Sequence, residues 1–247
     1  MMIANVINNI PQTWCVIIYY TSSGASQVGI DLSFGIQKLI EIHGSHRIQL
    51  VDIPSVVINE RRKRIHLMYH PWIWSSLPAN DVLVFGGNSV ICSNSPLNLT
   101  SFLAKDLDYL GAPWDAFNGQ GGDGGISLRK RDSMLKVIEY STTLSSSKKD
   151  QGKEREKEAS WQTWGAEDRF YVKNMLAMVK TGEYIFKIAK RLDTLQWSAI
   201  GSYAPTPHSI PPLPGEAPWA ASGTLPSVKT DKERELFLQY CPELKIL

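Results

Sequence analysis

The sequence predicts an α/β protein of one domain, built on a largely parallel sheet. Two short runs rich in β-branched and aromatic residues, 14–20 and 48–53, flank a helical pattern over 32–42. Strand, helix and strand joined by short connections are typical of a parallel α/β layer. A third apolar run, 82–85, has no polar position, as expected for a strand buried on both faces. The 247 residues allow one domain or two, and we favour one.

Composition excludes several classes of protein. Hydrophobic residues make up 43% and charged residues 20% of the chain, which is ordinary for a globular protein. The net charge of +2 is too small to indicate a nucleic-acid binder. No apolar run reaches the ~20 residues that cross a bilayer, and the amino end lacks a signal-peptide pattern. We therefore expect a soluble cytoplasmic protein with no membrane segment.

The three cysteines, Cys15, Cys92 and Cys241, are far apart and odd in number. This pattern predicts reduced thiols and indicates neither a disulfide framework nor a cysteine metal site.

The first predicted strand, 14–20, begins close to Met1. A doubly wound nucleotide-binding sheet usually begins with a strand whose loop contacts the base, so a missing amino-terminal strand stays open. The helix over 32–42 is expected to end at Gly44, because glycine favours the left-handed conformation that stops helices. Pro54 then ends the second strand.

A polar turn breaks the third apolar run. Ligands of open α/β sheets gather beyond the carboxyl ends of strands, so Asn88 and Ser89 are well placed to contact one. A turn asparagine in the left-handed conformation explains Asn88 equally well.

A glycine-rich stretch follows, in which 108–131 reads DYLGAPWDAFNGQGGDGGISLRKR. Glycines let the backbone turn sharply and approach a ligand, and consecutive N–H groups can cradle anionic oxygens. A surface loop is the alternative. We expect its basic tail, 129–131, to form the entrance of a helix at the surface.

Downstream, Glu167 and Asp168 open a predicted helix, whose dipole such first-turn carboxylates also stabilise. The segment 141–160 is nearly free of apolar residues and is expected to be a mobile charged insertion or a frayed helix end. The proline-rich segment 204–229 is expected to wrap the domain in an extended form.

These motifs, in this order, resemble an uncharacterised glycosyltransferase-like family common in fungi. The resemblance is carried by VLVFGGNSVICSNSP (82–96), DYLGAPW (108–114), GGDGGISLRKR (121–131), the acidic pair and His208. It implies a nucleotide-sugar transferase fold of the GT-A type, a single domain over 1–247 with a mixed, largely parallel central sheet flanked by helices. It also implies hexosyl transfer from a nucleotide sugar to an acceptor hydroxyl, with no nucleic-acid partner.

The same resemblance assigns roles to residues. Asp168 or Glu167 would take the proton from the acceptor hydroxyl. Asn88 and Ser89 would lie beside the diphosphate. His208 would either ligate Mn²⁺ or Mg²⁺, together with Asn88, or contact phosphate. The wall of the donor and acceptor pocket would comprise Trp114, Gly121, Gly122, Asp123, Gly124, Gly125 and Ser127.

One departure concerns the metal. Related folds place an Asp-x-Asp motif after the hydrophobic strand, whereas this chain has Gly-Gly-Asn-Ser at 86–89, and an amide is a weaker ligand for Mn²⁺ or Mg²⁺. The literal Asp-x-Asp at Asp106 and Asp108 precedes the Gly-Ala-Pro-Trp segment, and we interpret it as coincidence.

Two further hypotheses stand beside sugar transfer. An inactive relative could act as a binding or scaffold module. Phosphate-ester hydrolysis at the glycine stretch is weaker, because no nucleophile, metal cluster or P-loop accompanies it.

Overall fold

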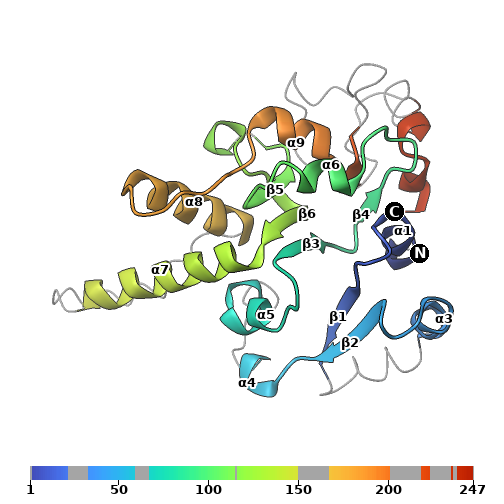
Figure 1. The fold of residues 1–247 in the computed structure, drawn as a ribbon, viewed down its shortest axis with the longest axis horizontal. Helices are drawn as coiled ribbons and strands as arrows, with labels where there is room; N and C mark the ends of the chain where they lie inside the picture. The colour runs from blue at the N-terminus through green and yellow to red at the C-terminus, as the bar shows by residue number, and fades with distance from the viewer. Residues whose placement is uncertain are drawn as a thin grey trace.

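A computed structural model describes residues 2–21, 33–58, 67–114, 116–149, 167–200, 218–222, 235 and 238–246. Within them the strands form three small sheets (Figure 1). The first sheet pairs β1 (Val16–Tyr20) with β2 (Ile48–Asp52) in parallel. The β-branched runs predicted at 14–20 and 48–53 are therefore confirmed as strands.

The second sheet is antiparallel throughout. Its central strand β6 (Asp123–Lys130) lies between β3 (Asp81–Phe85) and β5 (Tyr109–Ala112). The third sheet has the order β4-β8-β7, with β4 (Ser89–Ile91) antiparallel to β8 (Ala220–Ser222) and β8 parallel to β7 (Ser198–Ile200).

The prediction of a largely parallel central sheet of the GT-A type is wrong. The glycine-rich stretch continues into β6, a strand of eight residues that runs antiparallel to both of its neighbours. The sequence of an apolar strand does not depend on whether its neighbour is parallel or antiparallel. The run at 82–85 therefore could not reveal the antiparallel pairing with β6.

Helices pack around these sheets. The helix α3 (Phe34–His43) is capped at Gly44, as predicted, with φ of 84°. The α-helices are α1 (Met2–Asn9), α3 (Phe34–His43), α4 (Ser55–Ile58), α5 (Pro71–Ser75), α6 (Leu99–Leu103), α7 (Arg131–Lys149), α8 (Glu167–Lys180) and α9 (Arg191–Trp197). Short 3-10 helices are η1 (Leu67–Tyr69), η2 (Ala116–Gly119) and η5 (Pro242–Ile246).

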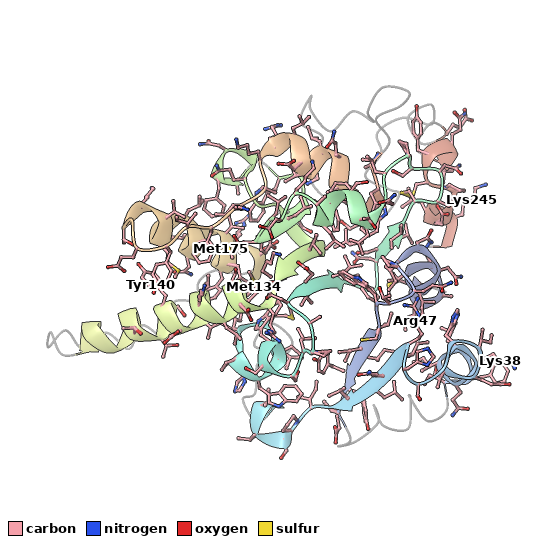
Figure 2. The ribbon with its side chains drawn as sticks, viewed as in Figure 1. Lys38, Arg47, Met134, Tyr140, Met175 and Lys245 are labelled. Atoms are coloured by element: carbon pink, nitrogen blue, oxygen red, sulfur yellow. A yellow bond between two sulfur atoms is a disulfide. The ribbon has the colours of Figure 1, made fainter. Side chains whose placement is uncertain are left out.

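Two apolar cores hold the elements together. The larger joins all three sheets through residues such as Ile48 of β2, Ile126 of β6 and Ala220 of β8. The second joins α5, α7 and α8 to β5, and Met134 of α7 and Met175 of α8 lie buried in it (Figure 2).

Arg47 fixes α1 against the first sheet. Its buried guanidinium donates from Nη2 to the Ile7 carbonyl (3.0 Å) and from Nη1 to the Pro11 carbonyl (2.9 Å), and Figure 2 labels it. A cation at the carboxyl end of a helix satisfies carbonyls that lack a helical partner.

Cys92 and Cys241 form a disulfide that joins the end of β4 to the residues just before η5. The prediction of reduced thiols is therefore wrong for this pair, while Cys15 is free. The two cysteines are 149 positions apart in sequence, so spacing alone could not show that the fold brings them together.

Two predicted segments are only partly described. α7 continues to Lys149, and residues 150–160 of the expected insertion lie outside the described residues. Of the proline-rich segment 204–229, only 218–222 are described, and they contain β8. Among the described helices, none has the length and apolar character needed to cross a membrane.

Candidate active site

The candidate site lies where the amino end of β6 meets the turn between β3 and β4 and the first turn of α8. The Gly125 carbonyl accepts hydrogen bonds from the Gly86 N–H (2.8 Å) and the Ser89 hydroxyl (2.7 Å). Asn88, in the same turn, is exposed. The structure thus brings together the polar turn and the glycine stretch, which the sequence analysis assigned to one ligand.

Gly124 joins this arrangement to α8. Its N–H donates to Asp168 Oδ2 (3.1 Å), and a Cβ at this position would lie 2.4 Å from Glu167 Oε1. Only glycine fits here without displacing the carboxylate, since Cβ atoms essentially never approach so closely. The acidic pair and the glycine stretch are therefore in direct contact.

The backbone beneath this contact is equally close. Gly122 has φ of 102°, and a Cβ on it would lie 2.4 Å from the Gly111 carbonyl carbon in β5. A side chain at residue 122 would force β5 and the start of β6 apart.

The carboxyl groups of Asp123 and Asp168 lie close enough to interact electrostatically. Burial raises the pKa of Asp123, the Gly125 N–H lowers it, and the negative charges of Asp168 and Glu167 raise it again. Asp168 is buried at the amino end of α8, where its Oδ1 accepts the Arg169 N–H (2.6 Å). The direction of this shift favours the protonated form of Asp123 more than in an ordinary carboxyl group, and the amino end of α8 favours negative charge beside it.

Glu167 is bound to a wholly buried arginine. Arg129 donates from Nη1 to Glu167 Oε2 (2.6 Å), from Nη2 to Oε1 (2.7 Å) and from Nε to the Ser127 hydroxyl (2.8 Å). Burial lowers the pKa of Arg129, but the charge of Glu167 outweighs it, and the pKa lies above its ordinary value. This bidentate pair engages both carboxylate oxygens of Glu167.

Three aromatic rings surround the Arg129 guanidinium. Its Cζ lies 4.8 Å from the ring centroid of Tyr109, 5.7 Å from that of Tyr171 and 5.9 Å from that of Trp74. Cation–π attraction is strongest where water is excluded, as it is here. We call Arg129, Glu167 and these three rings the arginine cage.

The arginine cage was missed by the sequence analysis, which expected Arg129 at a helix entrance on the surface. That expectation is wrong, because Arg129 is 0% exposed. A strand period of two places Ser127 and Arg129 on one face of β6, and this was the available signal. Because Arg129 is followed by two further basic residues, the sequence nevertheless predicts an exposed side chain.

Three other predicted pocket residues, Trp114, Ser127 and Gly121, make contacts within the fold. Trp114 is buried, and its Nε1 donates to the Gln120 carbonyl (2.7 Å). Ser127 is buried against Arg129. Gly121 packs against Val172 of α8, to which a Cβ would come within 2.4 Å.

The predicted metal ligands do not form a site among the described residues. No group of three or more His, Cys, Asp or Glu side chains suited to a metal occurs in the part of the chain that the structure describes. His208 lies outside that part. The exposed Asn88 amide alone does not match the anionic oxygen set that Mn²⁺ or Mg²⁺ prefers.

The literal Asp-x-Asp motif carries structural contacts. Asp106 pairs with Lys130 and Lys187, both at 2.7 Å, and these partners lower the pKa of Asp106 to about 2. Asp108 accepts the Lys187 N–H (2.7 Å) and the Ser133 hydroxyl. Both carboxylates are thus occupied in holding β5 to its neighbours.

Comparison with known proteins gives one family. A family model described as "Protein of unknown function (DUF5672)" matches residues 47–199, more than half of the chain. No curated protein and no solved structure matches. The matched range contains the turn 86–89, the glycine stretch and the acidic pair.

Proposed function

We propose that this chain, which belongs to the DUF5672 family of proteins of unknown function, transfers a sugar from a nucleotide-sugar donor to an acceptor hydroxyl. The observation that carries the proposal is the placement of two neighbouring carboxyl groups, Asp123 and Asp168, on the N–H groups of the glycine stretch, at 2.9 Å from Gly125 and 3.1 Å from Gly124. An enzyme that moves a sugar onto a hydroxyl needs a positioned base, and a carboxylate at the amino end of a helix suits that role.

In this proposal Asp168 is the base. It takes the proton from the acceptor hydroxyl as the acceptor oxygen bonds to the anomeric carbon, and the bond from that carbon to the diphosphate breaks. The Gly124 N–H donates to Asp168 Oδ2 (3.1 Å) and orients the base, and Asp123, whose pKa is raised, lies beside it. Glu167 positions the site through Arg129 and is not the base.

The donor would lie over the turn 86–89 and the glycine stretch. Asn88 is exposed there, and glycines allow a ligand to approach the backbone. The charge of the departing diphosphate needs a counter-charge, and Arg129 is already neutralised by Glu167. That counter-charge is not supplied by the described residues of the site, so the assay below is run with and without Mn²⁺.

The test combines binding with turnover. The purified chain is incubated with a panel of nucleotide sugars, with and without Mn²⁺, while melting temperature and release of nucleoside diphosphate are measured. We expect one donor to raise the melting temperature and to be turned over. Absence of both effects for every donor, in either condition, would contradict the proposal.

Variants then assign the base. Asp168→Asn is expected to lower turnover by about 10²- to 10⁴-fold while the donor still raises the melting temperature. Asp106→Asn is the matched control, because Asp106 has φ of 52°, which asparagine tolerates, and lies in the structural contacts described above. Equal activity in Asp168→Asn and Asp106→Asn would remove Asp168 from the reaction.

A second candidate is a scaffold or binding module without catalysis. Neutralisation of Arg129 by Glu167 and the amide at residue 88 favour it, because neither provides charge for a leaving diphosphate. Detectable turnover in the assay above would dispose of it.

Cytoplasmic location, expected from the sequence, stays a prediction. The buried disulfide between Cys92 and Cys241 weighs against it, because cytosolic thiols are kept reduced.

A further inference from the structure

An apolar groove of about 660 Å³ lies between β1 and β3, away from the carboxyl pair. One wall includes residues 14–19 and the other residues 79–85. Ile3 of α1 and Trp74 of α5 are among the residues that complete the lining. The groove therefore follows two strands along their length.

Both strands present an unpaired edge. Among the described residues, β1 pairs only with β2 and β3 only with β6. Each residue of β3 is only half-buried, although its sequence is that of a strand covered on both faces. Among the described residues, no strand pairs with β3 on the side away from β6.

The direction of the backbone groups on β1 follows from its bonds to β2. The Val16 N–H donates to the Arg47 carbonyl (2.7 Å), and the Tyr20 carbonyl accepts the Ile53 N–H (2.8 Å). Successive residues of a strand direct these groups to opposite sides. Ile17 and Tyr19 therefore direct theirs away from β2, to the edge that lines the groove.

The same reasoning holds for β3. The Gly86 N–H donates to the Gly125 carbonyl (2.8 Å), and the Asn80 carbonyl accepts the Arg131 N–H (2.7 Å), so even-numbered residues face β6. Leu83 and Phe85 direct their backbone groups to the opposite edge. Two rows of strand donors and acceptors thus border one groove.

The chemistry of the lining restricts the occupant. The single charged side chain among its described residues is that of Asp81, which is paired with Lys130 at 3.0 Å. An apolar small molecule would bury the edge groups without hydrogen bonds, which is costly. An extended peptide with uncharged side chains satisfies both the backbone edges and the apolar walls.

We propose that this groove binds a β-strand of a partner polypeptide, which inserts between β1 and β3. The inserted strand joins two small sheets into one, in the order β2, β1, partner strand, β3, β6, β5. Its recognised features are an extended backbone, β-branched or aromatic side chains and the absence of proline and charge.

The probe is a capped synthetic peptide in which alternating valine and isoleucine residues are flanked by lysines for solubility. Two control peptides carry the same sequence with N-methyl groups on the odd or on the even peptide nitrogens. A strand bonded on both sides needs both sets of N–H groups, so each control is expected to bind about tenfold more weakly.

Cys15 supplies an independent readout, because its free thiol lines the groove. We expect the unmodified peptide to raise the melting temperature and to slow alkylation of Cys15 by iodoacetamide at least several-fold.

Three results would overturn the proposal. One is failure of the peptide to bind, and another is equal binding of all three peptides, which would indicate a site for apolar molecules. The third is a concentration-dependent dimer that protects Cys15 without peptide, which would assign the groove to a second copy of the chain. None of these results depends on whether the chain transfers sugars.

Discussion

Replacing Glu167 by glutamine should destabilise the fold more than replacing its partner Arg129 by methionine. Glutamine keeps the size of the side chain but removes the charge that neutralises Arg129. The guanidinium is 0% exposed and cannot lose its proton, so it would stay charged and buried. Removing one partner of a buried ion pair costs about 3–5 kcal/mol.

The lower end of this range applies to Glu167→Gln, about 3 kcal/mol, because the aromatic rings retain part of the attraction for the cation. Arg129→Met leaves the opposite charge behind. The Glu167 side chain is 21% exposed and can be hydrated, and methionine fills the space between the three rings of the arginine cage. We therefore expect the unfolding free energy to fall by about 1–2 kcal/mol. The double variant should resemble Arg129→Met.

Urea unfolding, followed by tryptophan fluorescence and circular dichroism, gives the free energies for this double-mutant cycle. For a chain of this size a loss of 3 kcal/mol lowers the melting temperature by about 6–12 °C. Glu41→Gln is the matched control. Glu41 forms an exposed pair with Lys38, whose removal should change stability by at most about 0.5 kcal/mol.

The reasoning is refuted if Arg129→Met costs more than Glu167→Gln. It is also refuted if Glu167→Gln costs less than about 1 kcal/mol, since the buried charge would then carry no penalty.

Three other predictions concern Asp123, the disulfide and Tyr109. Because the pKa of Asp123 is raised in the folded state, its protonation stabilises the fold at pH values below the ordinary carboxyl pKa. This stabilisation is lost as the pH rises through the folded-state pKa. Asp123→Asn should remove this fall, so in urea melts the unfolding free energy of the variant relative to wild type should increase as pH is raised above the ordinary carboxyl pKa of about 4. A double Cys92→Ala and Cys241→Ala variant should have an unfolding free energy about 2–5 kcal/mol lower than that of the wild type. Adding a reductant to the urea series should lower the unfolding free energy of the wild type but not that of the variant. Tyr109→Phe should raise the unfolding free energy by about 1 kcal/mol in urea melts, because the buried hydroxyl has no hydrogen-bond partner among the described residues; a loss would indicate a partner.

Sequence reasoning located the strands β1, β2 and β3, because short runs of β-branched residues are a local signal. It also grouped the turn 86–89, the glycine stretch and the acidic pair, and the structure brings them into contact. That grouping came from the order of the motifs, which resembles that of a known family, and not from their spacing in the sequence.

Features that depend on contacts between distant residues were not predicted. The direction of β6 depends on how the chain returns after β5. The apolar pattern of the neighbouring strands is the same for either direction, so it could not predict an antiparallel sheet. Burial of Arg129 requires Glu167 and three rings from other elements. Asp123 was assigned to a pocket wall, and only the fold reveals that its carboxyl group interacts with that of Asp168.

The disulfide between Cys92 and Cys241 also changes how proteolysis of this chain must be read. A protease that cuts once between these positions leaves two fragments joined through sulfur. On a non-reducing gel the nicked protein keeps the mass of the intact chain, and separate bands require a reductant. Fragment maps of this protein therefore need paired reduced and non-reduced lanes to locate a cut within that span.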